Sequence, residues 1–300
     1  MKVLLLGANG QVGTECRRSL SKLGELVCAT RNGTLADGTR CEVADFDHPH
    51  ALAELVRVIE PDFVVNAAAY TAVDKAESEP ESALRANTEA PKVIAEACSD
   101  IGAYLIHYST DYVFDGNGSL PYSPDEATAP LGVYGASKLA GEDAIRASGC
   151  DHAILRTAWV YASHGKNFLL TMLRLAHERE ELRVVGDQIG TPTPAALIAD
   201  VTARIVNAPD RKTGLWHLTP HGQTSWHGFA EAIVEGAFAR GLLAKKPVVT
   251  AITTADFPTP AKRPAWSVLD NASLERDWDI RLPDWRAGLA SVLDEMKAGH

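Results

Sequence analysis

The chain has 300 residues, 46% of them hydrophobic and 23% charged, so it can form one large domain or two smaller ones around a substantial core. Its formal net charge of −10 argues against a surface for nucleic acid or for an anionic membrane. The five cysteines are scattered without a C-x-x-C pair, and no apolar run is long enough to cross a bilayer, so we expect a cytoplasmic protein with reduced thiols.

The start of the chain predicts a buried strand and a turn that can hold a phosphate. Lys2–Leu6 is a short apolar run, which favours a strand over a signal peptide. A G-x-x-G-x-x-G pattern follows at Gly7, Gly10 and Gly13, and then a helical stretch to about Leu23. Glycines let the backbone approach a ligand closely, and the N–H groups at a helix N-terminus attract a pyrophosphate. A simple turn is the alternative, but the strand and the helix around it favour a dinucleotide site.

The residues after the second expected strand, Glu25–Thr30, bear on the choice of cofactor. In dinucleotide-binding folds an acid at this point binds the ribose 2′-hydroxyl of NAD, whereas an arginine suits the 2′-phosphate of NADP. This chain has Arg31 and Asn32 there and no acid. We therefore expect NADPH, with NADH as the alternative if Arg31 is only a solvated loop residue. Asp45, followed by Phe46, opens a later connection and is a candidate to meet the adenine edge.

Two further strands, Phe63–Asn66 and residues 104–108, are expected to end at the edge where open parallel sheets bind their ligands. Small residues at 67–69 would let a flat ring lie against the backbone, with helix packing as the alternative. Ser109 and Thr110 follow the second strand. Such pairs commonly cap helices or turns, but this location makes them candidates for holding a carbonyl oxygen.

Tyr134 and Lys138 form the chemical centre of the sequence. They are four residues apart on an expected helix that runs to about Ser148, so they lie one turn apart on one face. A free tyrosine has a pKa of about 10, and an ammonium group beside it favours the phenolate and lowers that pKa. The pair can then exchange a proton with an alkoxide forming on a substrate. A half-exposed helix face is the alternative for the Y-x-x-x-K pattern alone.

The order of the expected elements predicts the fold class. Strands and helices alternate up to about residue 165, which predicts an α/β protein with a Rossmann-type doubly wound parallel sheet as its dinucleotide-binding domain over residues 1–165. One long helix is expected over residues 81–99. Residues 166–300 predict a smaller, mixed α/β substrate-binding lobe, with segments around 195–220 returning to the core domain.

A histidine pair and a basic loop are the remaining candidates for ligand binding. Pro49 separates His48 from His50, and no carboxylate or cysteine cluster accompanies them, so we expect no metal there. Lys262 and Arg263 lie between prolines in the stretch PTPAKRP, and proline stiffens a loop that presents cations. Such a loop suits the diphosphate of a sugar nucleotide, with a solvated loop as the alternative.

Together these motifs resemble the extended short-chain dehydrogenase/reductases and, more narrowly, the dTDP-4-dehydrorhamnose reductase family. The glycine turn and the Tyr134–Lys138 pair are common to the whole superfamily. The more specific stretches are VNAAAYTAVDKAE (65–77), STDYVFDG (109–116), VYGASKLAGE (133–142), RTAWVY (156–161), GDQIGTPT (186–193) and PTPAKRP (258–264), beside GQVG at 10–13. They extend over nearly the whole chain.

The resemblance implies NADPH-dependent reduction of the 4-keto group of dTDP-4-dehydro-L-rhamnose, the last step of dTDP-rhamnose biosynthesis, as in O-antigen synthesis. Thr110 would hold the carbonyl oxygen, Tyr134 would protonate it, and Lys138 would anchor the nicotinamide ribose. The implied cofactor contacts are Gly10, Gln11, Val12, Asp45, Phe46, Ala69, Tyr70, Thr71 and Lys138. The implied substrate contacts are Thr110, Asp111, Tyr134 and Trp159. A different sugar-nucleotide reductase or epimerase, or a non-catalytic regulatory subunit of the same fold, is the alternative.

The resemblance also bears on metal and assembly, because some family members form a dimer bridged by magnesium through glutamates. Glu15 and Glu295 lie in suitable expected helices, but an acid expected near Ala195 and Ala196 is absent. The resemblance therefore permits Mg²⁺, but the missing acid argues against a magnesium-bridged dimer. Both a monomer and a homodimer remain open.

Overall fold

A seven-stranded parallel sheet forms the centre of the computed structural model, which describes residues 1–299. Its strand order is β11-β6-β5-β4-β1-β2-β3. The strands are β1 (Lys2–Leu6), β2 (Glu25–Thr30), β3 (Glu42–Val43), β4 (Phe63–Asn66), β5 (Tyr104–Thr110), β6 (His152–Thr157) and β11 (Gly214–His217). The predicted doubly wound α/β fold is confirmed, and the order reverses between β1 and β4, where such sheets bind their ligands.

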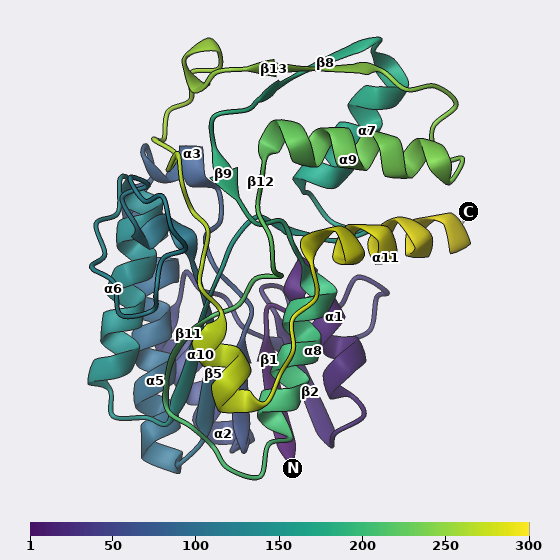
Figure 1. Cartoon of the computed structure of the whole chain (residues 1–300). Coiled ribbons are helices and arrows are strands. Elements are labelled where there is room, and N and C mark those ends of the chain that lie inside the picture. Colours follow the sequence, from purple (N-terminus) through teal and green to yellow (C-terminus); the bar gives the residue numbers. More distant parts are fainter. Residues whose placement is uncertain (300) are drawn as a thin grey trace.

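Two layers of helices cover the sheet (Figure 1). One layer holds α1 (Gln11–Leu20), α8 (Ala195–Val206) and α10 (Ala272–Trp278), and the other holds α2 (Pro49–Ile59), α5 (Ala90–Ile101) and α6 (Val133–Ala147). Val3 and Leu5 of β1 face the first layer, whereas Leu4 and Leu6 face the second. Alternate side chains of a strand point to opposite faces, so a strand between two helical layers must be apolar throughout.

The expected single helix over residues 81–99 is wrong, because the helix is interrupted. The short helices α3 (Val73–Ala76) and α4 (Pro80–Leu84) lead into a π-helical turn, η1 (Arg85–Glu89), before α5 begins. Buried Asn87 in this turn accepts a hydrogen bond from the Tyr70 backbone N–H at 2.9 Å and donates to the Tyr70 carbonyl at 3.0 Å. The wider turn thus holds the segment after β4 in place, and such turns are frequent at functional sites.

The smaller lobe lies beyond the carboxyl ends of the strands (Figure 1). Its core is formed by α7 (Phe168–Glu178), α9 (Trp226–Ala239), α11 (Trp285–Ala298), β8 (Glu181–Val185) and β13 (Val248–Ile252). Shorter elements complete it: β7 (Val160–Tyr161), β9 (Ile189–Gly190), β10 (Thr193–Pro194), β12 (Thr224–Ser225) and η3 (Thr254–Asp256). The short turn η2 (Asp111–Val113) belongs to the core domain, where it follows β5 and contacts α6. Among residues 1–299, no helix is long and apolar enough to cross a membrane.

Three segments of the second half of the chain lie in the core domain and not in the lobe. α8 packs on α1, and β11 is the edge strand of the central sheet beside β6. α10 also lies on this sheet, where Trp278 packs edge-on against Trp216 at 5.3 Å. The lobe core therefore consists of residues from either side of these returning segments.

Candidate active site

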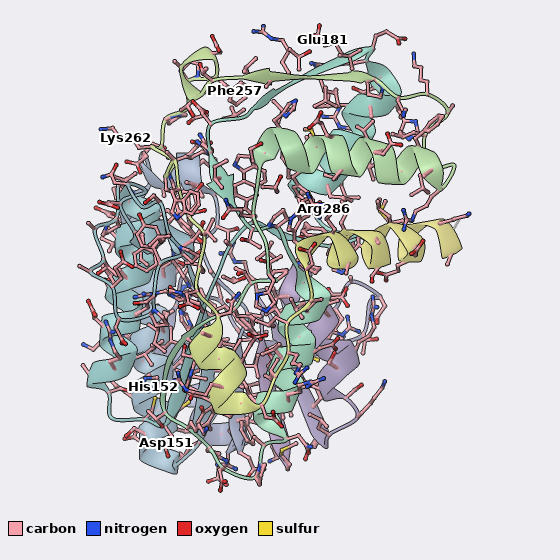
Figure 2. The ribbon with its side chains drawn as sticks, in the orientation of Figure 1. Asp151, His152, Glu181, Phe257, Lys262 and Arg286 are labelled. Atoms are coloured by element: carbon pink, nitrogen blue, oxygen red, sulfur yellow. The ribbon has the colours of Figure 1, made fainter. Side chains whose placement is uncertain are left out.

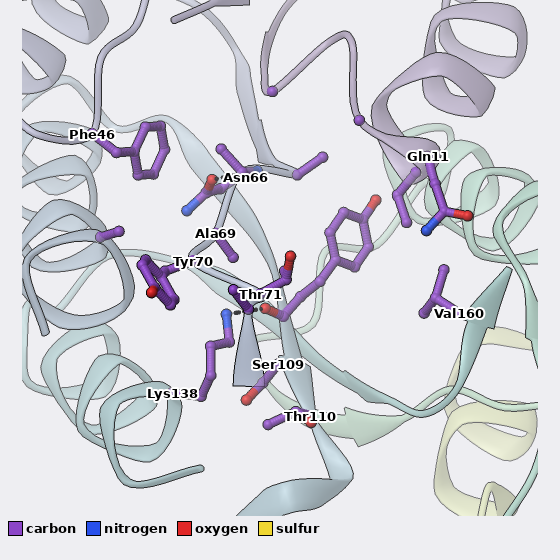
Figure 3. Close-up of a pocket in the computed structure, with 18 of the residues that line it drawn as sticks. Gln11, Phe46, Asn66, Ala69, Tyr70, Thr71, Ser109, Thr110, Lys138 and Val160 are labelled. Atoms are coloured by element: carbon purple, nitrogen blue, oxygen red, sulfur yellow. Dashed lines mark hydrogen bonds between the residues drawn. The ribbon is translucent and has the colours of Figure 1, made fainter. Parts of the chain in front are cut away.

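A cleft of about 1050 Å³ opens at the carboxyl ends of β1, β4, β5 and β6 (Figure 3). It brings together most of the residues predicted from the sequence. Those that line it are Gly7, Gly10, Gln11, Val12, Arg31, Phe46, Ala69, Tyr70, Thr71, Thr110, Asp111, Tyr134, Lys138 and Trp159. Asp45, Gly13 and Arg263 do not line it. Lining residues that the sequence did not point to include Asn9, Asn66, Asp47 and Lys166.

The glycine turn lies at the N-terminus of α1, where its backbone can approach a ligand. Gly7 has a φ of +79°, and a Cβ there would lie 2.8 Å from the carbonyl carbon of Ala67, so a larger residue is excluded. Gly13, also predicted to contact the cofactor, packs against the turn, and a Cβ there would lie 2.1 Å from the Gly7 carbonyl oxygen. It permits the helix to pack on the turn and does not face the cleft.

The end of the cleft beside β2 carries one cation. Arg31 lies 3.3 Å from Asp45 and 3.4 Å from Asp47, and its side chain is 71% exposed. Asp45 accepts hydrogen bonds within its own turn, from the Asp47 N–H at 3.1 Å and from His48 at 3.3 Å. Asp45 does not line the cleft and pairs with Arg31, and its contact with an adenine stays a prediction. The guanidinium is exposed but paired with the Asp45 and Asp47 carboxylates, so contact with a phosphate requires it to turn away from them.

The other end of the cleft holds the groups that can act on a carbonyl. Thr110 ends β5, and its hydroxyl donates to Asp111 Oδ1 at 3.0 Å while it accepts from the Tyr112 N–H at 3.2 Å. Burial raises the pKa of Asp111 to about 6. The Tyr134 ring packs edge-on against Tyr112 with centroids 5.5 Å apart. Thr110, Asp111 and Tyr134 thus line the same end of the cleft.

The prediction that Lys138 lies beside the Tyr134 phenol and lowers its pKa is wrong. Buried Lys138 points to β5, where its amine donates to the Tyr108 carbonyl at 2.7 Å (Figure 3). Burial lowers the pKa of Lys138 to about 8, against an opposing effect of the nearby Glu142 carboxylate. Burial raises the pKa of Tyr134 to about 12, in spite of a hydrogen bond with Thr110. Tyr134 is therefore protonated near neutral pH, as a proton donor must be.

Arg263, predicted to bind the diphosphate of the substrate, is paired with an acid and does not line the cleft. Its guanidinium binds Asp74 at 2.8 and 3.0 Å, and the Ala261 N–H also donates to Asp74 at 3.2 Å. Lys262 beside it is exposed, and it lies at the outer surface of the molecule (Figure 2). The pair joins the stretch 65–77 of the core domain to the stretch 258–264 of the second half of the chain. Its role is to hold this loop against the cleft-lining segment.

Trp159 forms a wall of the cleft in an unusual backbone conformation. Its φ is +48°, a left-handed value that is rare for a bulky residue. The indole stacks on Trp226 of α9, with centroids 3.6 Å apart and an angle of 7° between the rings. On Gly190, a Cβ would come within 2.6 Å of the indole. The lobe therefore fixes the position of a side chain that faces the core domain.

The residues considered for magnesium do not fit a metal. Arg18 lies between the two glutamates, 3.3 Å from Glu15 and 3.1 Å from Glu295. His164 takes the same oxygen of Glu15 at 2.8 Å. Within residues 1–299, no group of three or more His, Cys, Asp or Glu residues is arranged to hold a metal ion, and this includes His48 and His50. A cation of the protein itself thus occupies the space between the carboxylates.

A glycine turn beside the switch point of a doubly wound sheet, with Thr110, Tyr134 and Lys138 in one cleft, defines a nicotinamide-dependent oxidoreductase of the extended short-chain dehydrogenase/reductase class. Comparison with known proteins narrows this class. Residues 1–298 match the family described as RmlD substrate binding domain, and the chain belongs to this family.

Relatives and solved structures agree with this assignment. The chain is 47% identical to dTDP-4-dehydrorhamnose reductase of Escherichia coli K12, with 99% of the chain and 98% of the relative covered. It is 48% identical to the same enzyme of Burkholderia thailandensis, with 95% and 96% covered. The Bacillus anthracis dTDP-4-dehydrorhamnose reductase, solved in complex with NADP, superposes with a TM-score of 0.88 at 32% identity and covers 98% of this chain and 99% of its own.

Proposed function

We propose that this enzyme uses NADPH to reduce the 4-keto group of dTDP-4-dehydro-L-rhamnose to dTDP-L-rhamnose, the last step of dTDP-rhamnose biosynthesis. The observation that carries the proposal is the meeting of Thr110, Tyr134 and Lys138 in one cleft. The choice of substrate is supported by the 47% identity, over the full length of the chain, to a dTDP-4-dehydrorhamnose reductase. Under this proposal residues 1–165 hold mainly the cofactor, and the lobe within residues 166–300 holds the sugar nucleotide.

The residues of the cleft have different roles in the reduction. When bound, the cofactor supplies hydride to the carbonyl carbon. Tyr134, protonated because of its raised pKa, gives its proton to the oxygen as negative charge develops there. The Thr110 hydroxyl has one proton, which it donates to Asp111 Oδ1 in the structure, so it becomes the second donor for that oxygen by turning away from Asp111. The other carboxyl oxygen, Asp111 Oδ2, has no hydrogen-bond partner within residues 1–299 and is the acceptor for a sugar hydroxyl. Lys138 would bind the nicotinamide ribose, and it restores the proton of Tyr134 indirectly, because its amine hydrogen-bonds His107 and the Tyr108 carbonyl and not the phenol.

The backbone of the glycine turn holds the cofactor at its pyrophosphate. Gly10 precedes α1, so the N–H groups of Gln11 and Val12 begin the helix and face the cleft. They supply the partial positive charge that a pyrophosphate needs. Phe46 and the segment of Ala69, Tyr70 and Thr71 line the remaining length of the cofactor site.

A NADPH absorbance assay with a panel of keto-sugar nucleotides tests the proposed function. We expect NADPH consumption with dTDP-4-dehydro-L-rhamnose and much less with keto sugars carried on other nucleotides. An epimerase of the same fold would change the sugar without net consumption of NADPH. A regulatory subunit would show no turnover and would bind another enzyme in stoichiometric amount. Either of these outcomes would overturn the proposal.

Arg31 gives a prediction about cofactor choice. Replacing Arg31 with alanine is expected to raise the KM for NADPH by about tenfold or more, the effect of losing one charge-assisted hydrogen bond to a phosphate. The KM for NADH should change little, since NADH has no 2′-phosphate. Arg85 also lies near Asp47, at 3.6 Å, but does not line the cleft. The matched variant Arg85→Ala should therefore leave the ratio of the two KM values unchanged.

Trp226 gives a prediction about the sugar site. Replacing Trp226 with leucine removes the stack behind Trp159 and is expected to raise the KM for the sugar nucleotide roughly 3- to 10-fold, as for an aromatic pair worth about 0.5–1.5 kcal/mol. The KM for NADPH should hardly change. Trp278→Leu removes a comparable pair far from the cleft and is the control. Equal effects of the two variants on the sugar nucleotide would contradict a special role for Trp226.

The remaining features of the proposal concern location and assembly. We propose a cytoplasmic enzyme that acts on a soluble sugar nucleotide without nucleic acid or membrane partners, as a monomer or a homodimer. The net charge of −10 and five free cysteines support this setting.

A further inference from the structure

A row of buried polar groups extends behind the catalytic lysine. Asn66 ends β4, His107 lies beside it on β5, and Lys138 reaches them from α6. The Asn66 amide nitrogen lies 3.1 Å from His107 Nδ1, and Lys138 Nζ lies 3.2 Å from His107 Nε2. All three side chains are at most 2% exposed. Within such a dry row, each hydrogen bond needs one donor and one acceptor.

The backbone determines the direction of these hydrogen bonds. The Ala68 N–H can only donate, and it lies 3.2 Å from Asn66 Oδ1. The Asn66 oxygen is therefore the acceptor, and its amide nitrogen must donate to His107 Nδ1. A ring nitrogen that accepts carries no hydrogen. His107 is consequently neutral, with its hydrogen on Nε2, the nitrogen that faces Lys138.

This tautomer favours one form of the lysine. A histidine Nε2–H can donate to Lys138 Nζ only when that nitrogen has a lone pair, that is, when Lys138 is an uncharged amine. The amine can still donate to the Tyr108 carbonyl at 2.7 Å. An ammonium group would instead bring one of its hydrogens against the Nε2 hydrogen of His107. The geometry therefore disfavours the charged form of Lys138.

We propose that His107, held in its Nε2–H tautomer by Asn66, is a positioning residue that sets the pH at which Lys138 gains and loses its proton. The proposal rests on the proposed function, in which Lys138 restores the proton of Tyr134. It is consistent with a pKa of about 8 for Lys138, lowered by burial, and with a pKa of His107 that burial and the neighbouring Lys138 hold well below its ordinary value.

Other charged or titratable groups near Lys138 do not replace His107 in this role. Glu142 lies one turn further along α6 and raises the pKa of Lys138, but Arg156 from β6 binds both of its oxygens. His152 on β6 acts on His107 from the next strand. The remaining groups on the elements around Lys138 are Tyr134 on α6, the Tyr108 phenol on β5 and Asp111 in η2. Among the contacts of residues 1–299, Lys138 Nζ hydrogen-bonds His107 and the Tyr108 carbonyl.

The hydrogen bonds among Asn66, His107 and Lys138 affect turnover because each catalytic cycle consumes a proton. Tyr134 loses its phenolic proton to the new alkoxide, so its O–H bond breaks as the substrate O–H bond forms. An N–H bond of the Lys138 ammonium then breaks, and the phenol is restored. The amine takes a new proton from solvent. His107 exchanges no proton in this sequence, but it determines how readily Lys138 is charged and therefore where turnover declines at alkaline pH.

The pH dependence of kcat with NADPH and dTDP-4-dehydro-L-rhamnose tests the proposal. The natural enzyme should lose activity as pH rises through about 8, the pKa of Lys138. His107→Phe keeps a ring but removes the donor that favours the amine, so the alkaline decline should move upward by on the order of one pH unit. In His107→Gln the side-chain oxygen can accept from Asn66 and the amide can donate to Lys138, so the decline should stay in place. Equal profiles for all three proteins would overturn the proposal.

A second measurement needs no substrate. The long-range ¹H–¹⁵N spectrum of the histidines in the natural protein reports which ring nitrogen carries the hydrogen, and only His107→Gln is needed to assign the signal. We expect His107 to stay in the Nε2–H form from about pH 6 to 9, a range in which an ordinary histidine titrates. A Nδ1–H or doubly protonated ring would overturn the proposal. This result is independent of the substrate, so it separates failure of the proposal from failure of the proposed function.

Discussion

Replacing Tyr134 with phenylalanine is expected to lower kcat by about 10²- to 10⁴-fold, the usual effect of losing a general acid. The ring would still pack against Tyr112, 5.5 Å away in the natural protein, so the cleft should keep its shape. Only the proton donor is lost, because burial keeps this phenol protonated with a pKa of about 12. Steady-state turnover and the Kd for NADPH, measured by fluorescence titration, provide the check.

Tyr161→Phe is the matched control for this variant. The Tyr161 hydroxyl is buried and, within the described residues 1–299, has no hydrogen-bond partner. It does not line the cleft. Its removal should leave both turnover and the Kd for NADPH unchanged. If Tyr134→Phe turned over at the rate of this control, Tyr134 would have no part in the mechanism.

Replacing Arg156 with methionine is expected to lower the free energy of unfolding by about 3–5 kcal/mol, because it leaves a charged carboxylate buried without a partner. Arg156 donates to Glu142 at 2.7 and 2.9 Å, and the two side chains are 2% and 0% exposed. Ser109 also donates to this carboxylate at 2.5 Å. The pair lies directly behind the cleft, on β6 and α6. Equilibrium unfolding in urea measures the change.

Two further variants separate the buried charge from a general loss of packing. Arg174→Met removes an exposed pair with Glu178, 3.0 Å apart, and should have little effect on stability. The double variant with Arg156→Met and Glu142→Leu removes both charges and should recover much of the lost stability. If Arg156→Met were no less stable than Arg174→Met, the buried pair would not be an important contribution to the fold.

Local patterns were sufficient to predict the framework of the cleft. The strands β1, β2 and β4 have the predicted bounds. The apolar runs of β1 and β4 mark them because strands buried on both faces must be apolar throughout. A strand, a glycine turn and a helix within about 20 residues specify their own geometry. The spacing of Tyr134 and Lys138 likewise placed both on one face of α6.

Contacts between distant segments could not be read from these patterns. Arg263 meets Asp74 across 189 positions, so its basic loop gave no sign that the charge was already paired. The direction of Lys138 depends on a carbonyl and a histidine of β5, and helix spacing alone suggested Tyr134 as its neighbour. The π-helical turn η1 was missed because an extra residue in one turn leaves the apolar pattern of the helix nearly unchanged.

Hydride transfer to the sugar can be measured directly with NADPH that carries deuterium at the transferable position of its nicotinamide. After incubation with dTDP-4-dehydro-L-rhamnose, we predict one deuterium at C4 of the dTDP-L-rhamnose formed, with one NADPH oxidised for each molecule of product. A product without deuterium at C4, or unreacted substrate in the presence of folded protein and excess NADPH, would contradict the account.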